Sequence, residues 1–188
     1  MGGSPRVGGN SDLLLDAALK GAQSAGARTE KLHLNHLRIT PCQECGGCGR
    51  SGRCVIPDGM ALVYPLLREA DRLVVATPIF YGGYSAQLKE AIDRTQCCYV
   101  EKFVLGRPVH KARHPRKGIL LAVKARRNPA PFLWLEGMVK IFFFNQEVEY
   151  AGGLCYEGIE EVGAIRKHPT ALAEAFRAGQ SLAGPGED

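Results

Sequence analysis

The sequence of 188 residues predicts an α/β fold, in which a doubly wound parallel sheet carries helices on both faces. Three observations lead to this prediction. Short apolar runs, typical of buried strands, alternate with amphipathic segments of helical period. No internal repeat or long low-complexity linker interrupts that alternation. The length suits one domain with a sizeable core, which we assign to residues 1–188.

The elements are expected to alternate along the chain. Residues 11–26 have apolar side chains at helical spacing and begin with Ser11, a candidate N-cap. Residues 31–37 alternate apolar and polar side chains, as a half-buried strand does. Further helices are expected at 58–70 (kinked or broken by Pro65), 85–96, 130–144 and 169–183, and further strands at 72–79, 118–125 and 147–156.

The first strand of this pattern has almost no sequence available to it. A glycine-rich segment at the start of a doubly wound fold should follow a strand, yet almost nothing precedes Gly2. In the strand order 2-1-3-4-5 the first strand is internal. We therefore expect a truncated first strand; a strand that is absent altogether would leave a gap in the sheet.

The composition is that of an ordinary globular protein, with 45% hydrophobic and 23% charged residues. No apolar run approaches the roughly 20 residues of a membrane helix, and the first residues lack the apolar core of a signal peptide. We therefore expect a cytoplasmic protein and no membrane partner. The net charge of +5 is concentrated in residues 106–118 and 124–128. These are interpreted as a solvated loop or as a landing site for an acidic redox protein or a nucleotide phosphate. Nucleic acid is not expected, because no aromatic residues interleave the charges.

Four of the seven cysteines lie within thirteen residues, with the spacing C-x2-C-x2-C-x5-C. They are Cys42, Cys45, Cys48 and Cys54. Four thiolates can ligate structural zinc or a [4Fe–4S] cluster. Structural zinc usually takes two C-x2-C pairs a dozen or more residues apart, whereas three cysteines at intervals of three favour a cluster. Zinc and unligated thiols remain as alternatives. Cys97 and Cys98 are assigned to packing at a helix end.

Two further segments have the composition of ligand-binding loops. "GGSPRVGGNSD" combines flexible glycines with hydroxyl, amide and guanidinium donors just before a helix, an arrangement that favours bound anions. "ATPIFYGGYSAQLKEAIDR" leaves the end of a buried strand, where ligands of open α/β sheets bind. Its aromatic side chains and paired glycines can line one side of a flat heteroaromatic ring.

Together with the cysteine run, these segments resemble the NADPH-dependent FMN reductase family of flavodoxin-like proteins. The cysteine spacing is similar to that of the iron–sulfur flavoproteins within this family. The resemblance implies that the FMN phosphate is held by Ser4, Arg6, Asn10 and Ser11. It also implies that the isoalloxazine ring is bordered by Pro78, Ile79, Phe80, Tyr81 and Gly82. No side chain is assigned a catalytic role, because the chemistry belongs to the cofactors.

The leading hypothesis is an electron-transfer flavoprotein with FMN and a [4Fe–4S] cluster. It would exchange electrons with a redox protein such as a ferredoxin, or with NAD(P)H, and the resemblance implies a homo-oligomer, dimeric or tetrameric. Two alternatives remain at this point. One is an NAD(P)H-dependent FMN or quinone reductase without a cluster, and the other is a zinc-stabilised binding module without enzymatic activity.

Overall fold

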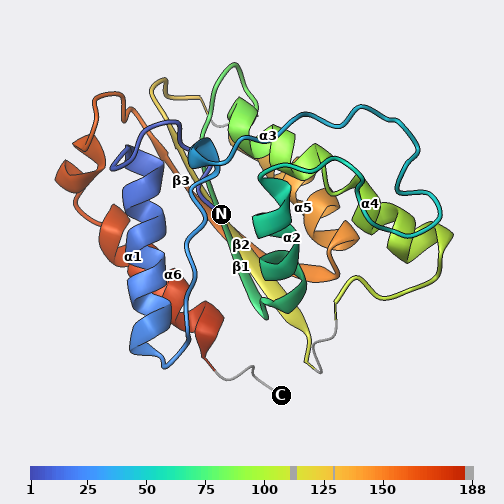
Figure 1. Cartoon of the computed structure of the whole chain (residues 1–188). Coiled ribbons are helices and arrows are strands. Elements are labelled where there is room, and N and C mark those ends of the chain that lie inside the picture. Colours follow the sequence, from blue (N-terminus) through green and yellow to red (C-terminus); the bar gives the residue numbers. More distant parts are fainter. Residues whose placement is uncertain (111–113, 129, 185–188) are drawn as a thin grey trace.

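The computed structural model describes residues 1–110, 114–128 and 130–184, so part of the basic segment 106–118 lies outside the described residues. Three parallel strands form the centre of the fold, in the order β1 (Arg72–Pro78), β2 (Arg116–Lys124) and β3 (Val148–Glu157) (Figure 1). Each follows one of the expected apolar runs to within two residues. The parallel sheet predicted from the alternation of elements is confirmed.

The first three residues extend this sheet on the free side of β1. The Gly3 amide donates to the Ala76 carbonyl (2.8 Å), and the Gly2 amide donates to the Leu32 carbonyl (2.8 Å). Gly2 forms parallel bridges to both Ala76 and His33. The segments therefore follow the expected order 2-1-3-4-5, with a first segment only three residues long.

The strand expected over residues 31–37 is wrong. Only His33 forms a bridge, and the chain then turns into a 3-10 helix, η1 (Leu34–His36). The neighbouring first segment offers too few backbone groups for a longer strand to pair with. The alternation of apolar and polar residues predicts a strand but does not show whether a neighbouring strand is long enough to pair with it.

Helices cover both faces of the sheet (Figure 1). One face carries α1 (Asn10–Ser24) and α6 (Ala171–Ala183), while α2 (Met60–Glu69), α3 (Ala86–Asp93) and α5 (Ala130–Asn145) cover the other. The short elements are α4 (Gln96–Tyr99), the π-helix η2 (Val100–Val104) and η3 (Ala164–Lys167). The N-cap of α1 is Gly9, which corrects the sequence-based choice of Ser11. No helix in the described ranges is both long and apolar enough to cross a membrane.

Alternate residues of β1 supply the two halves of the core. Leu73 and Val75 pack with the helices α2, α3 and α5, whereas Val74 and Ala76 pack with α1 and α6. Successive side chains of a strand point to opposite faces, so an apolar run with no polar interruption is what a sheet covered on both faces requires.

Two glycines allow α1 and α6 to touch backbone to backbone. A Cβ added at Gly21 of α1 would lie 1.9 Å from the Phe176 carbonyl oxygen, and one added at Gly179 of α6 would lie 1.9 Å from the Ala18 carbonyl oxygen. No larger residue fits at either position without separating the helices. The place of α1 on the sheet is therefore fixed by its contact with α6.

Candidate functional site

Residues 4–9 form a tight loop between the first three residues and α1. The Ser4 hydroxyl donates to the Arg6 carbonyl (2.8 Å) and accepts from the Arg6 amide (3.0 Å). Gly8 adopts a left-handed conformation (φ 69°), and its amide donates to the Asp12 carboxylate (2.9 Å). The loop thereby delivers the chain to the N-terminus of a 15-residue helix, where the first N–H groups have no intrahelical acceptor.

Ser11 is the side chain of this segment that best fits an anion. It is buried in the first turn of α1, and within the described residues its hydroxyl oxygen has no hydrogen-bond partner. A buried hydroxyl normally has a partner. A phosphate at the positive end of the helix would provide one, so the residues present fit the phosphate of a nucleotide cofactor.

The other two predicted phosphate residues lie differently. The Arg6 side chain is exposed on the loop. The Asn10 amide already has two partners, because it donates to the Glu161 carbonyl (2.8 Å) and accepts from the Ile165 amide (3.2 Å). Asn10 thus ties the segment after β3 to the start of α1. The cofactor roles of Ser4, Arg6, Asn10 and Ser11 stay predictions.

A buried ion pair supports the phosphate loop from below. Asp12 is 2% exposed, and its carboxylate lies 2.7 Å from the ammonium of Lys31, which also reaches Asp16 (2.6 Å). Burial alone would raise the pKa of Asp12, but hydrogen bonds from Lys31 and the Gly8 amide outweigh it and hold that pKa below its ordinary value. The carboxylate therefore stays ionised and keeps the Gly8 amide in place.

The second loop leaves β1 at Pro78 and forms a two-residue hairpin turn. The amide of Phe80 donates to the Gly83 carbonyl (3.1 Å), and the Gly83 amide donates back to Phe80 (2.9 Å). Tyr81 (φ 49°) and Gly82 (φ 80°) are both left-handed, as a tight turn of this kind requires. Phe80 and Tyr81 are exposed. The turn presents aromatic surface at the strand exit, as the sequence predicts.

Hydrogen bonds of neighbouring residues hold the two loops at the same edge of the sheet. The buried hydroxyl of Ser85, the N-cap of α3, donates to the Gly3 carbonyl (2.5 Å). The Asn35 amide donates to the Pro5 carbonyl (3.1 Å) and accepts from Gln87 (3.4 Å). The structure therefore brings together the segments 4–11 and 78–82, although no described contact assigns a cofactor role to Pro78, Ile79, Phe80, Tyr81 or Gly82.

The four clustered cysteines lie on a long loop that runs beside α4. Cys42 and Cys45 are exposed, Cys48 and Cys54 are half-buried, and all four are free thiols. Left-handed conformations at Glu44, Gly46 and Gly52 turn the loop back on itself. Across the described ranges no group of three or more His, Cys, Asp or Glu side chains is gathered closely enough to hold a metal ion. The donor chemistry fits a cluster, since four thiols share one loop, but the structure does not gather them around one point.

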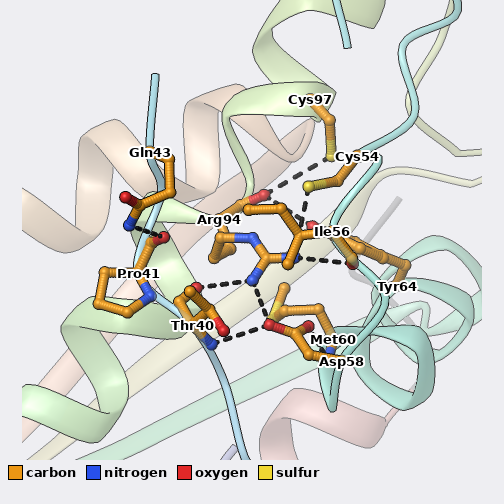
Figure 2. Close-up of polar contacts among 10 residues, drawn as sticks. All are labelled: Thr40, Pro41, Gln43, Cys54, Ile56, Asp58, Met60, Tyr64, Arg94 and Cys97. Carbon is orange, nitrogen blue, oxygen red and sulfur yellow. Dashed lines mark hydrogen bonds and ion pairs between the residues drawn. The ribbon is translucent and has the colours of Figure 1, made fainter. Parts of the chain in front are cut away.

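Arg94, which follows α3, connects the two ends of the cysteine loop through hydrogen bonds (Figure 2). Its buried guanidinium donates to the Thr40 carbonyl (2.6 Å), the Asp58 carboxylate (2.5 Å) and the Cys54 sulfur (3.3 Å). Burial alone would raise the pKa of Asp58, but hydrogen bonds from Arg94 and from the Thr40 and Met60 amides hold it below its ordinary value. Segments before and after the cysteines are thus attached to one cation.

Cys97 belongs to this region, a relation that the sequence analysis missed. It is buried, as predicted, but it packs beside Cys48 and Cys54, and its thiol lies 3.6 Å from the Arg94 carbonyl. A hydrogen bond from the Cys98 thiol lowers the pKa of Cys97. The sequence signal was the three-residue spacing of Arg94 and Cys97, which puts both on one side of a helical turn.

Comparison with protein families finds one that covers most of the chain. The model of the NADPH-dependent FMN reductase family matches residues 1–129. An iron–sulfur flavoprotein of Methanosarcina thermophila is 36% identical over 126 residues, which are 67% of this chain and 62% of the relative. Another, from Archaeoglobus fulgidus, is 41% identical over 92 residues, or 49% and 42% of the two chains. The chain thus spans less than two thirds of the length of these relatives.

Comparison with solved structures supports the fold. The NAD(P)H:quinone oxidoreductase from Methanothermobacter marburgensis superimposes with a TM-score of 0.74 over 98% of this chain and 94% of that one, at 18% identity. The Trp repressor binding protein from Bacillus subtilis gives a TM-score of 0.59 at 25% identity, covering 92% and 94% of the two chains. Both match the arrangement of a parallel sheet between helices described above.

Proposed function

Since the chain belongs to the NADPH-dependent FMN reductase family, in the branch of the iron–sulfur flavoproteins, we propose that it is an electron-transfer flavoprotein binding FMN and a [4Fe–4S] cluster. The observation that carries the proposal is the placement of three segments in one chain. Two loops that suit a nucleotide lie at the carboxyl edge of the sheet, where Ser85 at the start of α3 is bonded to Gly3. The loop with four free thiols is bonded to Arg94 at the other end of α3.

The flavin would be held by the two joined loops. The N-terminus of α1, with the unpartnered Ser11 hydroxyl, would bind the phosphate, with Ser4 shaping the loop and Arg6 adding a positive charge. The turn at residues 79–83 would border the ring, where Phe80 and Tyr81 exclude water from one side. When bound, FMN supplies the exchange between one-electron and two-electron partners, which no side chain can provide.

The cluster would be held by Cys42, Cys45, Cys48 and Cys54. Two of them are exposed, and a change in the conformation of residues 42–48 would have to bring the thiols together. A bound cluster supplies one-electron transfer. The electron donors that fit this chemistry are a small redox protein such as a ferredoxin, or NAD(P)H. The aromatic residues that would border the flavin are exposed, so a partner or a second subunit could contact them.

A second candidate is an NAD(P)H-dependent FMN or quinone reductase without a cluster. The specific observation in its favour is that the described thiols are not gathered around one point. In that case the cysteine loop would hold no cluster and would serve only to pack against α3 and α4.

Anaerobic purification with determination of iron, sulfide, zinc and FMN per chain separates the candidates. We expect about four irons, about four sulfides and one FMN per chain. Cys45→Ser should lose the iron and keep FMN, while Cys155→Ser, which removes a half-buried thiol in β3, should keep both. FMN without iron in the parent chain would establish the simple reductase, and one zinc per chain without FMN would contradict both candidates.

A further inference from the structure

Arg94 is a buried cation that the proposed binding of FMN and cluster does not itself require. Its exposed fraction is 1%, and it stands at the C-terminal end of α3, against the cysteine loop. Burial of a guanidinium is costly unless its donors find partners. The two terminal nitrogens of Arg94 have them in the carbonyls of Thr40 and Ile56, the carboxylate of Asp58 and the sulfur of Cys54, whereas its Nε has no partner among the described residues.

The orientation of Arg94 is fixed by contacts of its guanidinium and of its backbone carbonyl. One terminal nitrogen of the guanidinium binds Asp58 (2.5 Å) and the Thr40 carbonyl (2.6 Å), while the other reaches the Cys54 sulfur and the Ile56 carbonyl, both at 3.3 Å (Figure 2). At the backbone of the same residue, the Arg94 carbonyl accepts from the Tyr64 hydroxyl (2.9 Å). The planar fork of arginine can serve both sides at once, which a lysine ammonium cannot do.

We propose that Arg94 is a positioning residue for the cluster, whose hydrogen bond to the Cys54 sulfur makes the cluster easier to reduce. The inference rests on the proposed function, in which Cys54 is a ligand. Reduction adds one electron to the cluster from an external reductant, with no bond formed or broken in the protein. The added negative charge falls partly on the ligand sulfurs, and a donor aimed at one of them stabilises the reduced form.

Asp58 limits the effect to the short-range hydrogen bond. Its carboxylate forms an ion pair with the guanidinium and therefore cancels much of the charge seen from a distance. The carboxylate also accepts from the Thr40 and Met60 amides, so it is itself held in place. The contribution of Arg94 thus depends on its orientation, and loosening Asp58 should reduce that contribution without removing the cation.

The test compares three variants of the cluster-loaded protein. Arg94→Gln removes the guanidinium, and Asp58→Glu leaves it and the carboxylate charge but displaces the anchor by one methylene. Lys89→Gln is the matched control, because Lys89 is a cation on the same helix that pairs with Asp93 and is 49% exposed. Iron, sulfide and FMN contents are measured first, and the midpoint potential of the cluster is then determined by redox titration followed by electron paramagnetic resonance.

We expect the potential of Arg94→Gln to become more negative, by about a tenfold change in the ratio of reduced to oxidised cluster, or about 59 mV for one electron. Asp58→Glu, which keeps the carboxylate charge, should shift it less in the same direction, and Lys89→Gln should match the parent. An unchanged potential in Arg94→Gln would overturn the inference, as would loss of iron with FMN retained, because Arg94 would then serve assembly. If Arg94→Gln does not fold, Asp58→Glu decides by the same criterion. A parent chain that binds no iron would instead refute the proposed function.

Discussion

The contact between α1 and α6 predicts opposite effects for the same substitution at two glycines. Gly179 of α6 faces the backbone of α1, and an added Cβ would lie 1.9 Å from the Ala18 carbonyl oxygen. Gly137 lies in the interior of α5, and a Cβ there would have nothing within 4 Å. Alanine favours a helix over glycine by about 1 kcal/mol at either position. The two sites therefore differ only in the space available.

The magnitude follows from the close approach. At Gly179 the added carbon falls about 1.5 Å short of ordinary contact with a carbonyl that cannot rotate away, which places it at the upper end of the overpacking range, about 3 kcal/mol. After the gain in helix propensity, Gly179→Ala should lose about 2 kcal/mol of unfolding free energy, or about 4 to 8 °C in Tm for a chain of this size. Gly137→Ala should gain up to about 1 kcal/mol.

Urea unfolding of the FMN-free protein measures both changes, because bound FMN would add its own binding free energy to the unfolding free energy. Because α6 fixes the position of α1, Gly179→Ala should also weaken FMN binding, as read by fluorescence titration, while Gly137→Ala should leave it unchanged. Equal stability of Gly179→Ala and the parent chain would refute the tight backbone contact. A loss of stability with unaltered FMN affinity would refute the link between that contact and the phosphate loop.

Three further predictions concern the sheet edge at which the segments 4–11 and 78–82 lie. Ser85→Ala removes the hydroxyl donated to the Gly3 carbonyl and should cost about 1 to 3 kcal/mol of unfolding free energy in chemical denaturation, with weaker FMN binding. Lys31→Met leaves the buried Asp12 carboxylate without its cation and should cost about 2 to 3 kcal/mol, less than a fully buried pair because Lys31 is 27% exposed; calorimetry at pH 7 measures it. In the parent chain the lowered pKa of Asp12 contributes stability that is fully present above its unfolded-state pKa of about 3.9 and is lost as the pH falls below that value. Acid unfolding of the parent chain should therefore begin at no higher pH than that of Lys31→Met. The opposite order would contradict this reasoning.

The sequence predicts the sheet and its ligand edge because both depend on strong local patterns. The apolar runs of β1 and β2 have no polar interruption, and the ends of parallel strands meet at one edge wherever the helices are placed. The meeting of residues 4–11 with 78–82 follows from that rule. The contacts that flank these segments, such as that of Ser85 with Gly3, depend on side-chain rotamers and do not follow from it.

Three features could not be predicted, because each depends on a distant partner. Residues 31–37 have the alternation of a strand, but their neighbour in space is only Met1–Gly3. The Asn10 side chain has a donor suited to an anion, but its amide is bound to the segment after β3, some 150 residues along the chain. Arg94 reads as an ordinary helix-end cation, and only the folded chain shows that it lies beneath the cysteine loop.

The two caps of α3 have a mechanical consequence. Its N-cap, Ser85, is bonded to Gly3 of the first segment, and its C-cap, Arg94, is bonded to the cysteine loop, so eight helical residues separate the two attachments by about 12 Å. A helix fixes rotation as well as length. Inserting one residue would lengthen α3 by only about 1.5 Å but turn Arg94 by about 100° away from the loop. The register of this helix, more than the sequence of either loop, keeps the two regions facing their own partners.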